Sequence, residues 1–202
     1  MKKAVKAAPP PEKRRYSGQS FEDRQAERRA RLIQAALEVA GRTGLEGASV
    51  AAICAEADLT ARYFYESFPS REAIFVEAYR LAQDRLLGFM SASPGRDSAK
   101  SALTAFFTAL QEHPHAARVF LVDLDDHGLA MKVASHEGGK KLAKAFGVKA
   151  KHPLQLAGIV GGIVDIAKRW IESEFEEPVE TVVQIALPFT QIASSRPSST
   201  RS

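Results

Sequence analysis

The sequence predicts an all-α protein, and three observations support this fold class. Apolar residues recur at helical spacing in segment after segment. No stretch shows the alternation of apolar and polar residues that is typical of strands. Prolines and glycines separate the segments, for example at Ser93-Pro94-Gly95 and at His113-Pro114. At 202 residues, of which 45% are hydrophobic, the chain can form one domain or two small ones with a substantial core.

The window from Ser49 to Ala73 predicts two short helices joined by a tight turn and followed directly by a third helix. Ser49 is a good N-cap, because its hydroxyl can accept a hydrogen bond from an amide of the first helical turn. The first short helix carries one apolar stripe, formed by Val50, Ile53, Cys54 and Ala57. Asp58 and Leu59 are expected to form the turn, since Asp tolerates a left-handed backbone better than most residues.

The second short helix is polar and aromatic. Thr60 is expected to cap it, and Pro69 is expected to end it, because the residue before a proline is pushed out of the α region. The side chains expected to face the core are Leu59, Tyr63 or Phe64, and Phe68. Those expected to point outward are Ala61, Arg62, Tyr65 and Glu66. This pattern predicts a helix-turn-helix that reads DNA.

The stretch from about Arg28 to Ala78 resembles the N-terminal domain of TetR-family (tetracycline-repressor-like) transcriptional regulators. The resemblance rests on LIQAALEVAGRTGLEGASV, AAICAEADLT and ARYFYESFPSREAIF. Asp58 stands where the family usually has Gly, and Ser67 stands where it often has His or Tyr. The resemblance implies a three-helix DNA-binding domain over 21–70 and a helical effector-binding and dimerisation domain over 71–193. Residues 1–20 and 194–202 are expected to be a disordered basic arm and a disordered tail.

The resemblance also implies a function and its partners. We expect a homodimeric regulator, typically a repressor, that binds a palindromic operator in double-stranded DNA and is released by a small, largely apolar effector. The alternative is a helical DNA-binding or interaction protein without an effector. The candidate DNA-binding residues are Arg28, Ser49, Thr60, Ala61, Arg62, Tyr63, Tyr65 and Arg71.

Arg62 is the candidate for direct base reading, because its guanidinium can donate two hydrogen bonds to guanine in the major groove. It could equally bind a phosphate or remain solvated. Thr60 and Arg71 are candidates for phosphate contacts, and the resemblance implies that Tyr65 contacts the DNA backbone. Glu66 would repel phosphate, so we expect it to face away or to order a neighbouring arginine.

Charge is distributed unevenly along the chain. Residues 1–20 carry six basic residues and one acidic residue, whereas residues 21–80 hold eight basic and ten acidic ones. The predicted helix-turn-helix module is therefore not basic by itself. Its phosphate affinity must come from local placement and from the arm, which could follow the DNA or could be only a solubilising leader.

Further helices are expected over 71–92, 97–112, 115–126, 129–146, 153–174 and 178–193. The resemblance implies an effector cavity among the middle ones, although each apolar residue there could simply be core. The candidate pocket residues are Phe89, Met90, Phe106, Phe107, Leu110, Phe120 and Leu124.

The last two helices are apolar around too much of their circumference for one buried face. Two helices from each of two chains would form a four-helix interface around a twofold axis, which also suits a palindromic operator. The alternative is burial inside one subunit. The candidate interface residues are Ile159, Gly162, Ile163, Ile166, Trp170, Val182, Ile185 and Phe189.

Several other classes are disfavoured. His113, His115, Asp123, Asp125, Asp126 and His127 could be drawn as a metal site, but no compact zinc signature is present, so we expect no metal and no cofactor. No nucleophile motif is present, so we expect no enzyme. The one cysteine and the absence of a signal peptide suit the cytoplasm. Charges interrupt the most apolar segment, so we expect no membrane span.

Overall fold

The computed structural model describes residues 20–92, 98–121, 128–148, 150 and 152–191. Every regular element in this part of the chain is an α-helix, which confirms the predicted all-α fold. In chain order the helices are α1 (Phe21–Gly47), α2 (Val50–Glu56), α3 (Ala61–Ser67), α4 (Arg71–Ala92), α5 (Ala99–Glu112), α6 (Pro114–Leu121), α7 (Gly128–Ala145), α8 (Pro153–Glu172) and α9 (Val179–Gln191).

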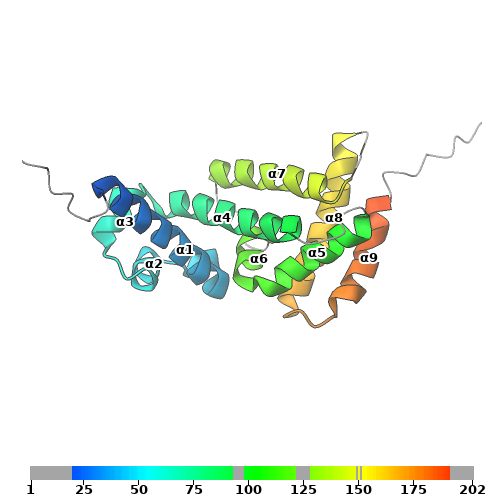
Figure 1. Ribbon diagram of the computed structural model, residues 1–202, viewed down its shortest axis with the longest axis horizontal. Coiled ribbons are helices and arrows are strands. Elements are labelled where there is room, and N and C mark those ends of the chain that lie inside the picture. Colours follow the sequence, from blue (N-terminus) through cyan, green and yellow to red (C-terminus); the bar gives the residue numbers. More distant parts are fainter. Residues whose placement is uncertain (1–19, 93–97, 122–127, 149, 151, 192–202) are drawn as a thin grey trace, which may run out of the picture.

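The molecule is elongated, with α1, α2 and α3 at one end and α8 and α9 at the other (Figure 1). Helix α4 begins beside α3 and runs through the middle, so it connects the two ends. Helix α1 packs against α4 and α6, while α7 lies along α4 and also contacts α8. Helix α9 packs on α5 and α8.

Local capping explains where several helices begin. The Ser20 hydroxyl accepts a hydrogen bond from the Asp23 amide, and the Asp23 carboxylate accepts one from the Ser20 amide; each bond is 3.0 Å long. This reciprocal pair starts α1 in the manner of a capping box. The Ser98 hydroxyl caps α5 by accepting a hydrogen bond from the Ser101 amide at 3.2 Å. Pro153 occupies the first turn of α8, where a proline fits without losing a hydrogen bond. The predicted helix over 115–126 corresponds to α6, but residues 122–127 lie outside the described part of the chain.

Aromatic packing holds α8 inside the subunit. The Trp170 indole lies edge-on between the rings of Phe107 and Phe175, with centroid distances of 5.6 and 4.9 Å. Its Nε1–H donates to the carbonyl oxygen of Glu177 at 2.8 Å. The indole is therefore both packed and hydrogen-bonded within one chain, as a buried Trp requires.

The broad apolar surface of α8 and α9 is accordingly not all free for a second subunit. Four candidate interface residues have side chains at most 4% exposed in the single chain: Ile159, Ile163, Trp170 and Val182. These four side chains pack in the chain's own core. Ile185 is 53% exposed, and Gly162, Ile166 and Phe189 are half-buried.

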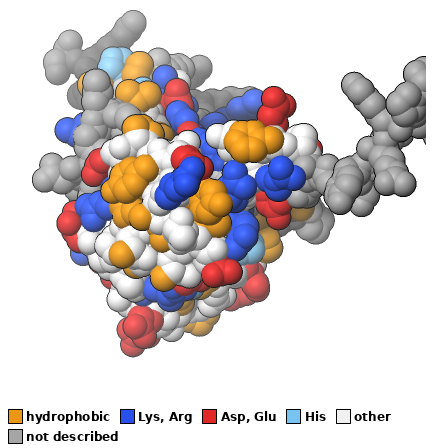
Figure 2. All heavy atoms as spheres, turned by 90° about the vertical axis from the view of Figure 1, so that its left-hand side faces the viewer, with side chains coloured by type: hydrophobic (Ala, Val, Ile, Leu, Met, Phe, Trp, Pro, Cys, Tyr) orange, Lys and Arg blue, Asp and Glu red, His pale blue; other side chains and the backbone are white. Residues whose placement is uncertain are grey.

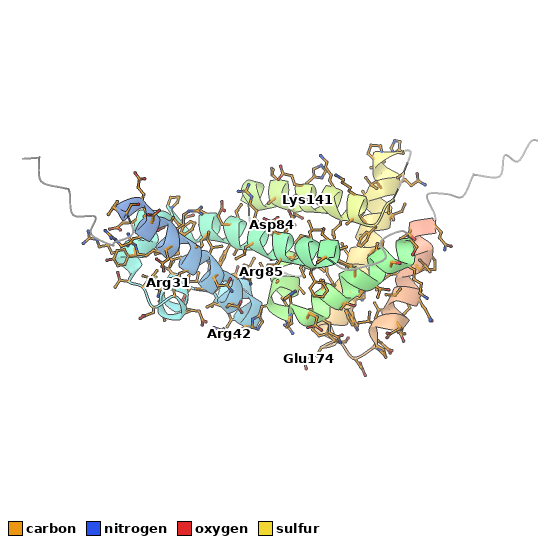
Figure 3. The ribbon with its side chains drawn as sticks, viewed as in Figure 1. Arg31, Arg42, Asp84, Arg85, Lys141 and Glu174 are labelled. Atoms are coloured by element: carbon orange, nitrogen blue, oxygen red, sulfur yellow. The ribbon has the colours of Figure 1, made fainter. Side chains whose placement is uncertain are left out.

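Helix α1 makes its closest contact with α6 at Gly41. A Cβ atom added at Gly41 would lie 2.6 Å from the Cα of His115, nearer than real Cβ contacts allow. Beside this contact, Glu38 of α1 receives a hydrogen bond from His115 Nδ1 at 2.5 Å and an ion pair from Arg85 of α4 at 3.8 Å. Figure 3 shows Arg85 on α4 next to α1. Three helices therefore meet at Glu38 and Gly41, which we call the α1 joint.

We predict that Gly41→Ala lowers the free energy of unfolding by about 1–3 kcal/mol, because overpacking must push the α6 backbone away from α1. Gly88→Ala is the matched control: Gly88 lies in α4, and a Cβ there meets nothing within 4 Å. That substitution should raise stability by about 0.5–1 kcal/mol, because Ala favours helix. Urea unfolding of the two variants measures both effects, and equal stabilisation by both would contradict the close approach at Gly41.

Candidate functional site

Helices α2 and α3 form the predicted helix-turn-helix. The Ser49 hydroxyl accepts from the Ala52 amide at 3.1 Å and so caps α2. Asp58 has a φ of 51°, in the left-handed region, and the Leu59 amide then donates to the Cys54 carbonyl at 2.9 Å. The chain thus reverses between α2 and α3 at the residue that sequence reasoning assigned to the turn.

The orientation of α3 is set by two phenylalanines. Phe64 is fully buried and Phe68 is 3% exposed, with 5.9 Å between their ring centroids. Tyr63 and Tyr65 are 36% and 61% exposed. Of the two candidates for the core position, Tyr63 and Phe64, it is Phe64 that lies in the core. Both tyrosines lie on the outer surface of α3.

Two arginines of α1 contact the helix-turn-helix and fix its position against α1. The Arg31 guanidinium donates to the Ala57 carbonyl at the end of α2, at 2.5 Å. The Arg29 guanidinium lies 4.8 Å from the centroid of the Phe68 ring. Both side chains therefore serve the packing of the module.

A further ion pair links α1 to α2. Arg42 and Glu56 are 2.5 Å apart, and the hydrogen bond from Arg42 to this carboxylate raises the pKa of the guanidinium. Figure 3 shows Arg31 and Arg42 on the side of α1 that faces α2. Because its charge is matched by Glu56, Arg42 adds little net positive potential to the surface.

Arg62 and Glu66 form an exposed pair one turn apart on α3. The Arg62 Nε donates to the Glu66 carboxylate at 2.9 Å, and this hydrogen bond raises the pKa of the guanidinium. The Arg62 side chain is 84% exposed. The expectation that Glu66 orders a neighbouring arginine is confirmed. Arg62 is held at the surface by a contact that water screens, so it can exchange Glu66 for another acceptor.

Two other predicted residues are tied to aromatic rings. The Arg28 guanidinium lies 4.7 Å from the centroid of the Tyr63 ring, which links α1 to α3. The Arg71 guanidinium lies 5.4 Å from the Phe75 ring and donates to the Glu46 carbonyl at 3.4 Å. Both arginines lie beside α3 with part of their surface exposed.

Thr60 differs from expectation. It occupies the N-cap position of α3, and its carbonyl oxygen accepts from the Tyr63 amide at 3.0 Å, but its side chain makes no capping hydrogen bond. The prediction that the Thr60 hydroxyl caps α3 is therefore wrong. Ala61 is the first residue of α3 and is exposed, so the helix start is accessible.

These residues share one end of the molecule. Figure 2 shows that end, where basic side chains lie next to exposed hydrophobic side chains, with acidic side chains both among them and toward the periphery. Basic groups next to exposed tyrosines are what phosphate binding and contact with thymine methyl groups require.

Comparison with known families decides what this end is. Residues 32–78 match the model of the bacterial regulatory proteins of the tetR family. This segment therefore carries the N-terminal domain of the TetR family. The matched residues run from α1 through α2 and α3 into α4, so the family domain includes the start of the helix that connects the two ends of the molecule.

Solved structures share this fold over most of the chain. The multidrug binding protein EbrR, complexed with imidazole, is 17% identical and superposes with a TM-score of 0.66 over 86% of this chain and 98% of its own. The regulator FadR from Bacillus subtilis, in complex with stearoyl-CoA, is 17% identical, with a TM-score of 0.63 over 80% and 96%. A transcriptional regulator from Rhodococcus sp. Rha1 is 18% identical, with a TM-score of 0.62 over 84% and 99%. Among curated proteins, no sequence match is significant.

The part of the chain beyond the helix-turn-helix contains a cavity of about 570 Å³ between α4, α6, α7 and α8. This volume is within the usual range of small-molecule sites. Its lining consists of Tyr79, Phe120, Leu121, Ser135, His136, Gly139, Lys140, Leu142, Pro153, Leu156, Ala157, Val160, Gly161 and Val164.

The predicted pocket residues lie mostly elsewhere. Phe120 is the one that lines this cavity. Leu124 lies outside the described residues, and Phe89 is half-buried against the core. The others are core side chains at most 3% exposed: Met90, Phe106, Phe107 and Leu110. Sequence reasoning missed the α7 side of the cavity, although the spacing of His136 and Lys140 places them on one helical face.

Two buried groups of the described chain show no sign of nucleophilic use. Burial raises the pKa of the Cys54 thiol, which suits a structural residue rather than a reactive one. Burial also raises the pKa of the Tyr79 phenol to about 12, although hydrogen bonds with Ser135 and Gln83 oppose this shift. Tyr79 is therefore a neutral donor at the cavity wall.

Metal and membrane features are also absent from the part of the chain that the structure describes. No group of three or more His, Cys, Asp or Glu side chains converges there; of the suspected metal ligands, 123–127 lie outside this part. None of the described helices is long and apolar enough to cross a bilayer.

The left-handed turn at Asp58 gives a testable prediction. Asp58→Gly should raise the free energy of unfolding by up to about 1 kcal/mol, because Gly adopts positive φ without the steric penalty of a Cβ atom. Asp58→Val should lower it by about 1–2 kcal/mol, because a β-branched residue is strained there. Thermal unfolding checks both variants, and an opposite order of their stabilities would contradict the assigned backbone conformation.

Proposed function

We propose that this TetR-family chain is a ligand-responsive transcriptional repressor that binds a palindromic operator as a homodimer. The observation that carries the proposal is the pairing of an exposed, arginine- and tyrosine-bearing α3 with a separate cavity. Helix α1 links the two, because it packs on α3 and also on the cavity-lining helices α4 and α6. We further propose that the protein acts in the cytoplasm and without catalysis.

The exposed face of α3 supports major-groove reading. Arg62 projects from the first turn of α3, where recognition helices contact base edges, and Tyr65 follows one turn later. Arg28, Thr60 and Arg71 flank α3 and can contact phosphates, together with the Ser49 hydroxyl and the Ala61 amide. Since the module carries more acidic than basic residues, binding depends on the exchange of acidic partners for phosphate.

The exposed remainder of α8 and α9 supports a dimer. Ile185 is 53% exposed, and Phe189 lies one turn further along α9. The Phe189 ring packs directly on Gly162 of α8, where an added Cβ would meet it at 2.6 Å. Together with Ile166, these residues form one apolar patch that spans both helices, and a twofold axis through it would pair each patch with its copy.

The α1 joint provides a route between cavity and DNA. Helix α6 lines the cavity with Phe120 and Leu121 at one end and contacts α1 with His115 at the other. Helix α4 likewise lines the cavity with Tyr79 and contacts α1 through Arg85. A ligand that prefers one position of α4 and α6 would therefore shift α1 and the spacing of the two α3 helices, and would change operator affinity by its differential binding.

The alternative is a DNA-binding protein without an effector. The cavity volume favours the ligand-responsive function, and related folds are consistent with it: FadR from Bacillus subtilis was solved with stearoyl-CoA, and EbrR is described as a multidrug binding protein. An operator complex whose affinity no cavity ligand changes would favour the alternative.

For DNA binding, we predict that Arg62→Ala combined with Tyr65→Phe weakens operator affinity by about 10- to 100-fold, because one base contact and one phosphate contact are lost per subunit. The control is Arg169→Ala, since Arg169 forms the same one-turn ion pair with Asp165 and is 76% exposed on α8. Fluorescence anisotropy on a palindromic fragment and on a scrambled duplex, at several salt concentrations, measures the effect. Equal affinity for both duplexes would refute sequence-specific regulation.

For the dimer, we predict that Ile185→Glu raises the dimer Kd by at least about 100-fold, because a twofold interface carries the buried charge twice. Val133→Glu is the control, since Val133 is 50% exposed on α7 and outside the patch. Analytical ultracentrifugation gives the two constants. A dimer that survives Ile185→Glu, or one that only Val133→Glu dissociates, would place the interface elsewhere.

A further inference from the structure

The cavity between α4, α6, α7 and α8 has chemically distinct walls. Its α6 and α8 walls are apolar and include Phe120, Leu121, Leu156 and Val160. The α7 wall carries Ser135, His136, Gly139 and Lys140, so most of the polar groups of the lining come from one helix. A ligand that fills this space must itself be apolar on one side and polar on the other.

The polar wall carries positive charge and no negative charge. Lys140 is exposed and forms no ion pair with any residue in the described part of the chain. His136 lies one turn earlier on the same face of α7. None of the described lining residues is Asp or Glu. An ammonium group bound here would have no carboxylate to pair with, whereas an anion could form an ion pair with Lys140.

The remaining polar groups at this wall are neutral. The Tyr79 phenol is 2% exposed and hydrogen-bonded to Ser135, so it keeps its proton. Pro153, in the first turn of α8, also lines the cavity, and the partial positive charge of a helix start has the same sign as Lys140. None of the described lining residues carries a negative charge that would repel an anion.

We infer that the effector is an amphipathic anion, with a hydrocarbon body between α6 and α8 and an acid group against Lys140 on α7. This inference rests on the proposed effector site and deepens it, because it excludes lipophilic cations as the natural class. A free carboxylic acid and an acyl thioester of a phosphorylated carrier share this chemistry, and the experiment distinguishes them.

The test compares three probes of equal chain length on the full-length protein: decanoate, decanol and decyltrimethylammonium. Isothermal titration calorimetry should give a Kd for decanoate about tenfold lower than for either of the others, as a charge-assisted contact predicts. Decanoyl-CoA is the fourth probe. If its Kd is lower than that of decanoate, the effector is an acyl thioester rather than a free carboxylic acid. Decanol or the cation binding as tightly as decanoate would overturn the inference, and so would no binding of any probe.

Substitutions locate the effect. Lys140→Met should abolish the preference for decanoate, whereas Lys132→Met, an exposed lysine on the same helix outside the lining, should leave it unchanged. Gly139→Leu should weaken the binding of all four probes. A Cβ at Gly139 meets nothing within 4 Å, so a leucine side chain can enter the cavity and occupy space that the probes need. An unchanged preference in Lys140→Met would also overturn the inference.

Operator release is measured in parallel by anisotropy. Preferential decanoate binding that leaves DNA affinity unchanged would contradict the proposed function while the ligand class stands. Release by decanol and decanoate at equal concentrations would support the proposed function and contradict the ligand class. The two failures are therefore distinguishable.

Discussion

The close approach of α1 to α6 at Gly41 is the constraint on which the rest of the arrangement depends. With no side chain at this position, the α6 backbone comes near enough for His115 to reach Glu38, while Arg85 reaches the same carboxylate from α4. The contact fixes α1 against the two helices that line the cavity. Since α1 also holds α2 and α3 through Arg31 and Arg29, the position of the helix-turn-helix follows from this joint.

Local ion pairs explain how an acidic module can have a basic face. Many of its glutamates lie beside arginines: Glu38 pairs with Arg85, Glu56 with Arg42, and Glu66 with Arg62. The pairs differ in exposure, because Arg42 is 44% exposed whereas Arg62 is 84% exposed. An exposed pair contributes little to stability, so giving up Glu66 for a phosphate or base costs little. The count of charges therefore says less about binding than the placement of each pair.

Sequence reasoning predicted the helices and the turn well, because capping residues and apolar spacing are local signals. Ser49 caps α2, Asp58 turns the chain, and α4 ends at Ala92 before Ser93, all as expected. What could not be predicted depends on contacts distant in sequence. The hydroxyl of Thr60 makes no cap despite a favourable residue type. The cavity wall on α7 depends on how α7 lies along α4, which no local pattern encodes.

Helix α8 shows why apolar circumference alone misplaces an interface. One face, with Ile159 and Ile163, packs in the core, and a second, with Val160 and Val164, lines the cavity. A third face, with Gly162, meets Phe189 of α9. The helix is apolar nearly all round because it serves three surfaces of one chain. The surface left for a second subunit is correspondingly narrower, and it adjoins the helix that lines the cavity. In the proposed dimer, ligand occupancy and subunit arrangement would therefore influence each other through α8 as well as through the α1 joint.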